Sequence, residues 1–307
     1  MTKTKVAVLG AGGMLGSMVL DVFSRDEQFS VLCTVRKSKD ALLIKKEYKN
    51  ITVKVLDAEK ATKEQISKLL AGYKWIINAI GIIKPYIHDD NPEETMRALH
   101  VNAMFPHFLA QACLKNNSRI LQIATDCVYS GTKGNYTEKD EHDATDVYGK
   151  TKSLGEAYYK NISHIRCSII GPEKKNHLSL MDWFLGQTKN AKLNGFKNHL
   201  WNGVTTLHFA YICRAIIKNK IEIGHIQHVI PSGRITKADL LRQFAQNFNR
   251  SDVVINSVDA PKVIDRTLNT DNSALNKRIW QAAGYKTPPT VQKMVKELAE
   301  YKYQSKI

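Results

Sequence analysis

The sequence predicts an α/β protein with a doubly wound, Rossmann-like parallel sheet, followed by a smaller C-terminal α/β lobe. The first 170 residues alternate short β-branched runs with amphipathic segments, and this rhythm changes after Pro172. Strands that alternate with helical segments imply βαβ units, with helices on both faces of a parallel sheet. In such sheets ligands bind at the carboxyl ends of the strands, so motifs that directly follow a strand carry the most functional information.

Six apolar runs are expected as strands, at 5–10, 29–35, 51–56, 74–81, 119–125 and 164–171. The helical segments between them are expected at 13–25, 38–47, 62–71, 92–115 and 146–161. The second part should add helices at 178–189, 206–219, 237–249, 273–283 and 290–303, and strands at 225–230 and 252–257.

The predicted domain boundary lies at the change of rhythm. Residues 1–171 are expected to form the Rossmann domain, with returning segments near 203–235, and residues 172–307 to form the substrate lobe. A chain of 307 residues suits one large or two modest domains.

Composition is typical of a globular protein, with 43% apolar and 24% charged residues. No run approaches the roughly 18 to 20 apolar residues that a membrane helix needs. The N-terminal stretch MTKTKVAVLG reads as a first strand and not as a signal peptide. We therefore expect a cytoplasmic protein without a membrane partner.

Cysteine usage and charge argue against two further classes of function. The five cysteines have no CxxC pair or metal-ligand spacing, so we expect reduced core residues and no metal: they are Cys33, Cys113, Cys127, Cys167 and Cys213. The net charge of +16 is spread over the chain without interleaved aromatics, which disfavours nucleic acid. A basic surface also suits anionic small molecules.

A glycine-rich turn, GAGGMLG, follows the first predicted strand and opens a helix. Glycine permits a tight turn and close backbone approach, and the helix N-terminus offers N–H groups to a pyrophosphate. In this context the motif predicts dinucleotide binding, although a turn selected for packing alone is the alternative. The predicted contacts are Gly10, Gly13, Met14, Leu15 and Gly16.

Arg36 and Lys37 follow the second predicted strand, where a cofactor without a 2′-phosphate usually meets an acidic residue. Two cations suit a phosphate on the adenosine ribose. The sequence therefore favours NADP(H) over NAD(H), unless both residues are ordinary surface charges.

Two further strand ends are predicted to contact the cofactor. Asp57, with Ala58 beside it, could accept a hydrogen bond from the adenine amino group, and the turn at 78–81 gives the ribose small neighbours. Each could instead be an ordinary loop residue. The remaining predicted contacts are Asn78, Ala79, Ile80, Gly81 and Asn102.

A hydroxyl, a phenol and an ammonium are expected to meet at the end of the fifth strand. Thr125 ends that strand, and Tyr148 and Lys152 lie four residues apart on one face of the next helix. An ammonium about 4 Å away favours phenolate by about 4 kcal/mol at an effective dielectric near 20, or about three pKa units. We therefore expect Tyr148 to transfer the proton, Lys152 to lower its pKa, and Thr125 to polarise a carbonyl oxygen during hydride transfer.

These motifs resemble an extended short-chain dehydrogenase/reductase. More narrowly, the segments ATDCVYSGTKGNYTEKDEHDATDVYGKTKSLGE and HVNAMFPHFLA are similar to the dTDP-4-dehydrorhamnose reductase branch. The resemblance covers the first 170 residues well and the rest loosely. It implies that Thr125, Tyr148 and Lys152 form the catalytic set. It also implies that NAD(P)H reduces the 4-keto group of a nucleotide-linked 6-deoxyhexose for glycan precursor synthesis.

Departures from the family pattern bear on the substrate. Cys127 stands where related sugar dehydratases carry glutamate, which favours reduction, and Ala124 stands where serine is usual. The loop NHLWNGVTT also differs from the branch's usual substrate loop, although its polar and aromatic side chains suit a sugar. Trp201 could equally pack between lobes. The predicted substrate contacts are Lys84, Asp126, Cys127, His177, Asn198, Trp201, Asn202 and Thr205.

Two alternatives to the reductase stay open at this point. One is a nucleotide-sugar epimerase, or a bifunctional epimerase/reductase. The other is a cofactor-binding regulatory subunit without turnover, like that of methionine adenosyltransferase, against which the intact catalytic set argues. A homodimer is possible.

Overall fold

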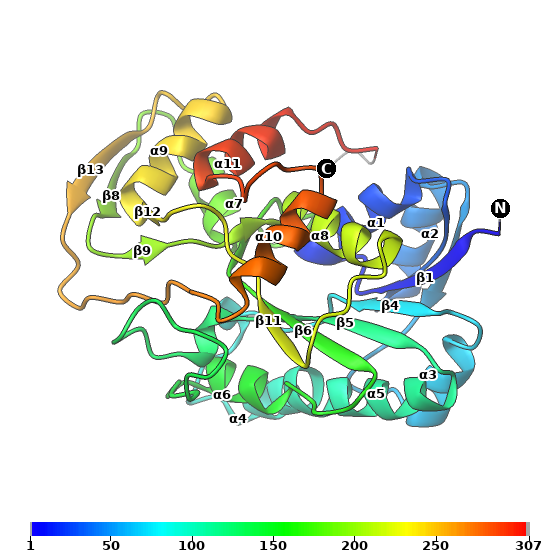
Figure 1. Ribbon diagram of the computed structural model, residues 1–307. Coiled ribbons are helices and arrows are strands. Elements are labelled where there is room, and N and C mark those ends of the chain that lie inside the picture. The colour runs from blue at the N-terminus through cyan, green and yellow to red at the C-terminus, as the bar shows by residue number, and fades with distance from the viewer. Residues whose placement is uncertain (1, 305–307) are drawn as a thin grey trace.

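A seven-stranded parallel sheet forms the centre of the molecule (Figure 1), as the computed structural model of residues 2–304 shows. Its strand order is β11-β6-β5-β4-β1-β2-β3, so the direction of winding reverses between β1 and β4. The strands are β1 (Thr4–Leu9), β2 (Phe29–Val35), β3 (Ile51–Val55), β4 (Trp75–Asn78), β5 (Arg119–Ala124), β6 (Ile162–Arg166) and β11 (Ile226–His228). The predicted doubly wound fold is confirmed.

Helices cover both faces of this sheet (Figure 1). One apolar core lies under α1 (Met14–Ser24), α2 (Ser38–Glu47) and α8 (Thr206–Lys218). A second core lies on the opposite face, under α3 (Lys63–Leu69) and α5 (Phe105–Lys115). Because both faces are covered, the central strand β1 is apolar without alternation, and residues 6–9 have no exposed surface.

The second half of the chain contributes both to this sheet and to a separate group of short strands. β11 extends the sheet beside β6, and α8 packs on α1. The short strands pair as β7 (Ile169–Ile170) with β10 (Val204–Thr205), β8 (Lys192–Phe196) with β13 (Val254–Val258), and β9 (Leu200–Trp201) with β12 (Ile235–Thr236). The remaining helices are α7 (Leu180–Leu185), α9 (Lys237–Asn247), α10 (Ser273–Ala282) and α11 (Val291–Glu300).

Three predicted elements differ from those observed. The segment 92–115 is α4 (Pro92–Ala98), a π-helical stretch η2 (Leu99–Met104) and α5, and the strand predicted at 164–171 divides into β6 and β7. The helix predicted at 146–161 is α6 (Val147–Leu154) and ends before Gly155. A Cβ atom at Gly155 would lie 1.9 Å from the Asn102 carbonyl oxygen, so α6 and η2 approach each other closely there.

The C-terminal segment folds back onto α1 through Asp21, whose residue is fully buried. The Asp21 carboxylate accepts hydrogen bonds from Tyr48 Oη (2.9 Å), Tyr301 Oη (2.7 Å) and the Gln304 backbone N–H (2.9 Å). Arg25 completes the cluster with an ion pair at 2.8 Å. The two ends of the chain are therefore joined at one buried carboxylate.

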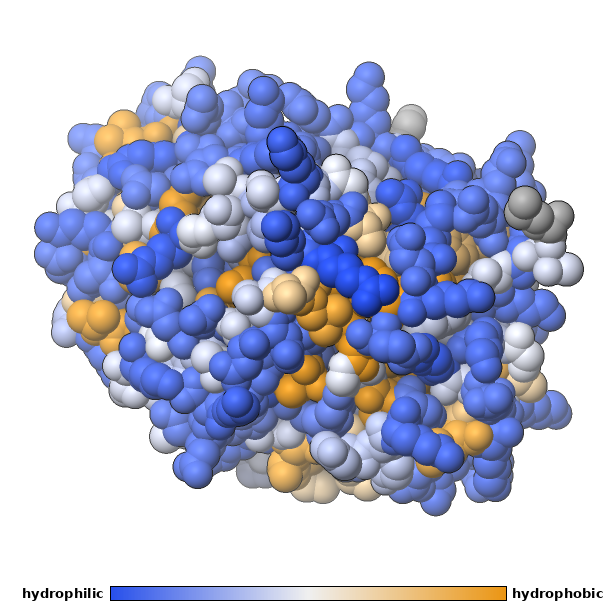
Figure 2. Space-filling view, viewed as in Figure 1, coloured by the Kyte–Doolittle hydropathy of each residue, from blue (hydrophilic) through white to orange (hydrophobic). Residues whose placement is uncertain are grey.

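The surface is mainly hydrophilic in Figure 2, with apolar residues gathered in a band near the middle of that face. Of the five cysteines, all of them free, only Cys127 is partly exposed. Within residues 2–304, no helix is both long enough and apolar enough to cross a membrane.

Candidate functional site at the carboxyl edge of the sheet

The glycine turn after β1 is shaped by two close approaches. Gly10 has φ +83°, a left-handed conformation that favours glycine, and a Cβ atom there would lie 2.9 Å from Ile80 Cγ1. At Gly16 a Cβ atom would lie 2.1 Å from the Gly10 carbonyl oxygen. Gly13 precedes α1 as its cap residue, and no side-chain cap accepts from the first N–H groups of the helix. This backbone geometry can hold a pyrophosphate at the start of α1, where Met14 and Leu15 lie.

Arg36 and Lys37 lie beside this turn. The Gly10 N–H donates to Thr34 Oγ1 at 3.2 Å and the Ala11 N–H to the Thr34 carbonyl at 2.8 Å, which joins the turn to the end of β2. Both cations are exposed, and neither forms an ion pair with any residue from 2 to 304. They are therefore available to an anionic group of a ligand.

The end of β3 presents Asp57 and Ala58, both partly buried. Asp57 Oδ1 accepts a hydrogen bond from the Glu59 N–H at 3.2 Å, which leaves the other oxygen, Oδ2, for a ligand. The predicted adenine contact is compatible with this geometry.

Asn78 and Asn102, both predicted as cofactor contacts, order the loop after β4. Asn78 is fully buried, and its amide donates to Gln122 Oε1 at 2.7 Å and accepts from the Ile80 N–H at 3.1 Å. Asn102 is bound to the Ile82 backbone on both sides, at 2.8 and 3.0 Å. The less buried wall of this loop consists of Ala79, Ile80 and Gly81.

Thr125 and Tyr148 meet at the end of β5. Thr125, 8% exposed, caps the short 3-10 turn η3 (Asp126–Val128) by accepting from the Cys127 N–H at 3.2 Å. Its hydroxyl donates to Asp126 Oδ1 at 3.3 Å, and it lies close enough to the partly buried Tyr148 phenol to lower the pKa of that phenol. The two predicted side chains are therefore brought together.

Lys152 approaches the same edge from the next turn of α6. Asp146 caps this helix by accepting from the Gly149 N–H at 2.7 Å, which fixes where the Tyr148 and Lys152 face begins. The Lys152 ammonium donates to the Ile123 carbonyl at 3.1 Å, and a Cβ atom built on Gly81 would lie 4.0 Å from it. Lys152 thus lies between the end of β5 and the loop after β4.

The acidities of these groups differ from the expectation. Burial, together with the carboxylates of Asp126 and Asp146, raises the pKa of Tyr148 above its usual value, although the Thr125 hydroxyl opposes this. The expectation that the pKa of Tyr148 is lowered is therefore wrong, because burial and the nearby carboxylates raise it. Burial also lowers the pKa of Lys152 to about 8, partly offset by the charge of Glu156.

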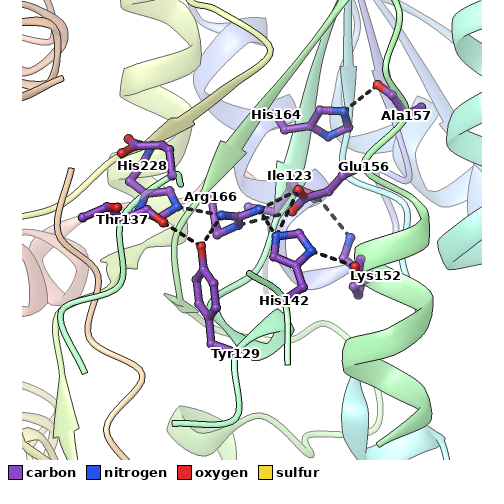
Figure 3. A network of polar contacts seen from close by, with 12 residues as sticks. Ile123, Tyr129, Thr137, His142, Lys152, Glu156, Ala157, His164, Arg166 and His228 are labelled. Atoms are coloured by element: carbon purple, nitrogen blue, oxygen red, sulfur yellow. Dashed lines mark hydrogen bonds and ion pairs between the residues drawn. The ribbon is translucent and has the colours of Figure 1, made fainter. Parts of the chain in front are cut away.

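Behind Lys152 lies a buried polar network centred on Arg166 (Figure 3). The Arg166 guanidinium, 1% exposed, pairs with Glu156 at 2.5 and 3.2 Å. It also donates to Tyr129 Oη at 2.6 Å, His228 Nε2 at 2.8 Å and His142 Nε2 at 2.7 Å. Since both histidines accept from a cation, both are neutral. The network fixes Glu156 just after the end of α6, four residues beyond Lys152, and no sequence motif marks it.

Asp126 and Cys127, both predicted as substrate contacts, follow Thr125 in η3. Asp126 is 8% exposed, and burial raises its pKa, opposed by the charges of Arg266 and Lys237. Cys127 Sγ lies 3.8 Å from Asp126 Oδ1, and burial raises the thiol pKa to about 12, so the thiol is protonated. Lys84 is engaged by Asp146, 2.7 Å away.

Arg266 and Lys237 also lie near Asp126, although neither was predicted from the sequence. Arg266 Nε donates to the Tyr129 carbonyl at 2.7 Å, and Lys237 is the first residue of α9. Both reach the site from the second half of the chain and neither belongs to a motif. Their charges both lower the pKa of Asp126, which places them near that carboxylate. This proximity exists only in the folded chain.

The predicted substrate loop is largely occupied by its own contacts. Asn198 exchanges two hydrogen bonds with Ala260, and Asn202 does the same with Leu268. Thr205 is fully buried and caps α8, so it has no surface for a sugar.

Trp201 and His177 also have internal partners. Trp201 is 4% exposed, and its indole N–H donates to Ser168 Oγ at 2.9 Å, as in the packing alternative. His177 bonds Asp182 at 3.0 Å, and no described contact joins it to the end of β5. Among residues 2–304 no cluster of side chains suits a metal ion.

The sheet order and the glycine turn define a Rossmann-type dinucleotide-binding fold. The chain belongs to the RmlD substrate binding domain family, whose profile matches residues 4–303. A dTDP-4-dehydrorhamnose reductase from Aggregatibacter actinomycetemcomitans is 29% identical over 161 residues, which is 52% of this chain and 48% of the relative. The methionine adenosyltransferase 2 subunit beta of Rattus norvegicus is 26% identical over 154 residues, 50% of this chain and 41% of the relative. The matched segments therefore span about half or less of these curated relatives.

Two solved structures share the fold over nearly their whole length. A dTDP-4-dehydrorhamnose reductase from Bacillus anthracis in complex with NADP has a TM-score of 0.70 and 14% identity, covering 97% of this chain and 99% of that one. A UDP-glucuronic acid 4-epimerase from Bacillus cereus in complex with UDP-glucuronic acid and NAD has a TM-score of 0.72 and 17% identity, with the same coverage. At these identities the likeness supports the fold alone.

Proposed function

We propose that the protein is an NADPH-dependent reductase of a nucleotide-linked 4-keto-6-deoxyhexose. The observation that carries this proposal is the meeting of Thr125, Tyr148 and Lys152 at the carboxyl end of β5, beside the loop after β4. Family membership and the reductase relatives support the substrate class. On this proposal the protein acts in cytoplasmic glycan precursor synthesis, and a homodimer stays a prediction.

The three side chains have distinct roles in this proposal. A bound NADPH supplies the hydride. Tyr148, whose pKa is raised, is fully protonated at neutral pH and donates its proton to the oxygen of the substrate carbonyl. Thr125 donates a hydrogen bond to the same oxygen as charge develops there. Lys152 is mostly protonated at pH 7, and its charge stabilises the phenolate that remains.

The cofactor preference is argued from the end of β2. Arg36 and Lys37 are exposed, free of ion pairs within the described chain, and adjacent to the glycine turn. A 2′-phosphate would neutralise them, whereas a 2′-hydroxyl would not. We therefore propose NADP(H) over NAD(H).

The test is oxidation of NADPH, and separately of NADH, with a panel of nucleotide-linked 4-keto sugars that varies base and stereochemistry. We expect substrate-dependent oxidation with at least one dTDP- or UDP-linked 4-keto-6-deoxyhexose, and a higher kcat/KM with NADPH. A preference for NADH would overturn the cofactor assignment and leave the reductase intact. If no member of the panel causes oxidation of NADPH or NADH, the reductase proposal is overturned.

The epimerase alternative has a specific reason to be kept, since an epimerase of known structure shares the fold. It predicts tightly copurifying cofactor and sugar interconversion without net loss of NADPH. The regulatory subunit alternative, motivated by the methionine adenosyltransferase relative, predicts cofactor binding with no turnover of any sugar. The same panel, with product analysis, separates the three.

A further inference from the structure

The backbone of Lys237 is fixed at the start of α9, and its ammonium lies against an aromatic ring. Lys237 is the first residue of α9, its backbone N–H donates to the His199 carbonyl at 2.9 Å, and Thr236 caps the helix before it. Its ammonium lies 5.7 Å from the centre of the Trp201 ring. Trp201 is itself fixed by its hydrogen bond to Ser168 Oγ. The Lys237 side chain therefore packs on an indole ring that has a fixed position.

This support lies over the reacting edge of the sheet. β5 and β6 are parallel neighbours with Ala124 opposite Arg166, so two residues further along the chain Asp126 and Ser168 follow neighbouring strand ends. The Trp201 indole is bonded to Ser168, and Lys237 lies against that indole. Lys237 therefore reaches the substrate side of Thr125 from the second half of the chain.

The charge of Lys237 has no direct partner. No carboxylate within residues 2–304 lies at ion-pair distance from it, and its influence on Asp126 acts over a longer range. Burial lowers the pKa of Lys237, and the charge of Asp126 opposes this from beyond ion-pair distance. Lys237 is partly buried, so an ammonium without a carboxylate at ion-pair distance is available to an anion that a ligand supplies.

We propose that Lys237 is a specificity-determining residue that binds anionic oxygens of the substrate next to the reacting sugar. These oxygens belong to the diphosphate of the nucleotide, because a 6-deoxyhexose carries a methyl group and no carboxylate at C6. The inference rests on the proposed function, because it takes the end of β5 as the place of the sugar. Arg266 lies on the same side of the site. Its terminal guanidinium nitrogens have no hydrogen-bond partner in the described chain, so they can bind the same anionic oxygens.

The test compares Lys237→Met, which keeps a long apolar stem on Trp201, with Lys237→Arg, which keeps the charge. Lys296→Met is the matched control, since it removes one charge from an exposed side chain on α11. Binding of dTDP, UDP-glucose and UDP-glucuronate is measured by calorimetry on the intact protein saturated with NADPH, and NADPH affinity is measured separately.

We expect Lys237→Met to weaken anion binding by about tenfold or more, with NADPH affinity unchanged. Weaker binding of dTDP identifies the diphosphate. Unchanged dTDP binding with weaker binding of UDP-glucuronate alone would overturn the assignment to the diphosphate, and would indicate a carboxylated sugar in place of the proposed 6-deoxyhexose. Lys237→Arg should retain most of the affinity, and Lys296→Met all of it.

Equal affinities in wild type and Lys237→Met would overturn this inference and leave the proposed function standing. An equal loss in Lys237→Arg and Lys237→Met would also overturn it, because charge would not be the cause. Failure of the wild type to bind any of the three nucleotides would overturn the inference together with the proposed substrate class.

Discussion

At the residue scale, burial changes the pKa values of Tyr148 and Lys152 in opposite directions. Tyr148 is held as a neutral phenol, while Lys152 has a pKa of about 8 and remains mostly charged at pH 7. A proton donor must begin protonated, so the raised pKa of Tyr148 suits reduction of a carbonyl. The charge of Lys152 becomes useful when the phenolate forms.

Tyr148→Phe removes only the phenolic oxygen. We expect turnover to fall by about 10² to 10⁴, with NADPH binding largely retained. Tyr158→Phe is the control, because Tyr158 is 83% exposed and lies on the segment after α6. Both variants are compared by steady-state kinetics on the best substrate of the panel. Unchanged turnover in Tyr148→Phe would end its assignment as proton donor.

Single residues also show the limit of prediction from sequence. Thr125, Tyr148 and Lys152 were predicted together because each lies at a recognisable place in a motif. The upward shift of the Tyr148 pKa was not predicted, because it depends on burial and on acidic groups that only the folded chain brings together. Lys237 and Arg266 belong to no pattern and come from distant segments, so only the fold reveals them.

At the element scale, α1 depends on close contact with the turn that precedes it. A Cβ atom on Gly16 would lie 2.1 Å from the Gly10 carbonyl oxygen, which is backbone and cannot move aside easily. The helix can accept a side chain here only by shifting away from β1.

Gly16→Ala should therefore destabilise the protein by about 1 to 3 kcal/mol and weaken NADPH binding. Gly224→Ala is the matched control, since no atom lies within 4 Å of a Cβ built there. Urea unfolding and cofactor fluorescence measure the two effects. Wild-type stability in Gly16→Ala would show that the contact is relieved at no cost.

Element boundaries were predicted unevenly. β2 and α2 were located correctly because apolar periodicity and flanking polar residues agree there. The stretch 92–115 reads as one helix, yet it contains the π-helical η2 that carries Asn102 to the Ile82 backbone. No local propensity marks that widened turn, because it follows from a tertiary contact.

At the scale of the whole molecule, two buried histidines make stability depend on pH. Burial lowers the pKa of His164 and of His228 from 6.5 to about 4, and both are fully buried. Between pH 6.5 and 4 the unfolded chain binds these protons and the folded chain does not. Stability is therefore present above pH 6.5 and falls as the pH decreases toward 4.

His164→Gln should reduce this pH dependence by up to one proton, or about 1.4 kcal/mol per pH unit. His199→Gln is the control, because that ring is partly exposed and bonds only a backbone carbonyl, that of Lys262. The free energy of unfolding in urea is compared at pH 7.5, 6 and 5. Equal slopes for His164→Gln and wild type would contradict a neutral buried His164.

The carboxylate of Asp21 joins the two ends of the chain and thereby ties folding to protein synthesis. Asp21 leaves the ribosome early, whereas Tyr301 and Gln304, which bond it, follow 280 and 283 residues later. At about 5 to 20 residues per second, the ribosome needs roughly 15 to 60 seconds to make that interval. During that time the site of α1 where they dock stays open to water. The sheet needs only the residues up to β11, so docking of the C-terminal segment on α1 is a later step than completion of the sheet.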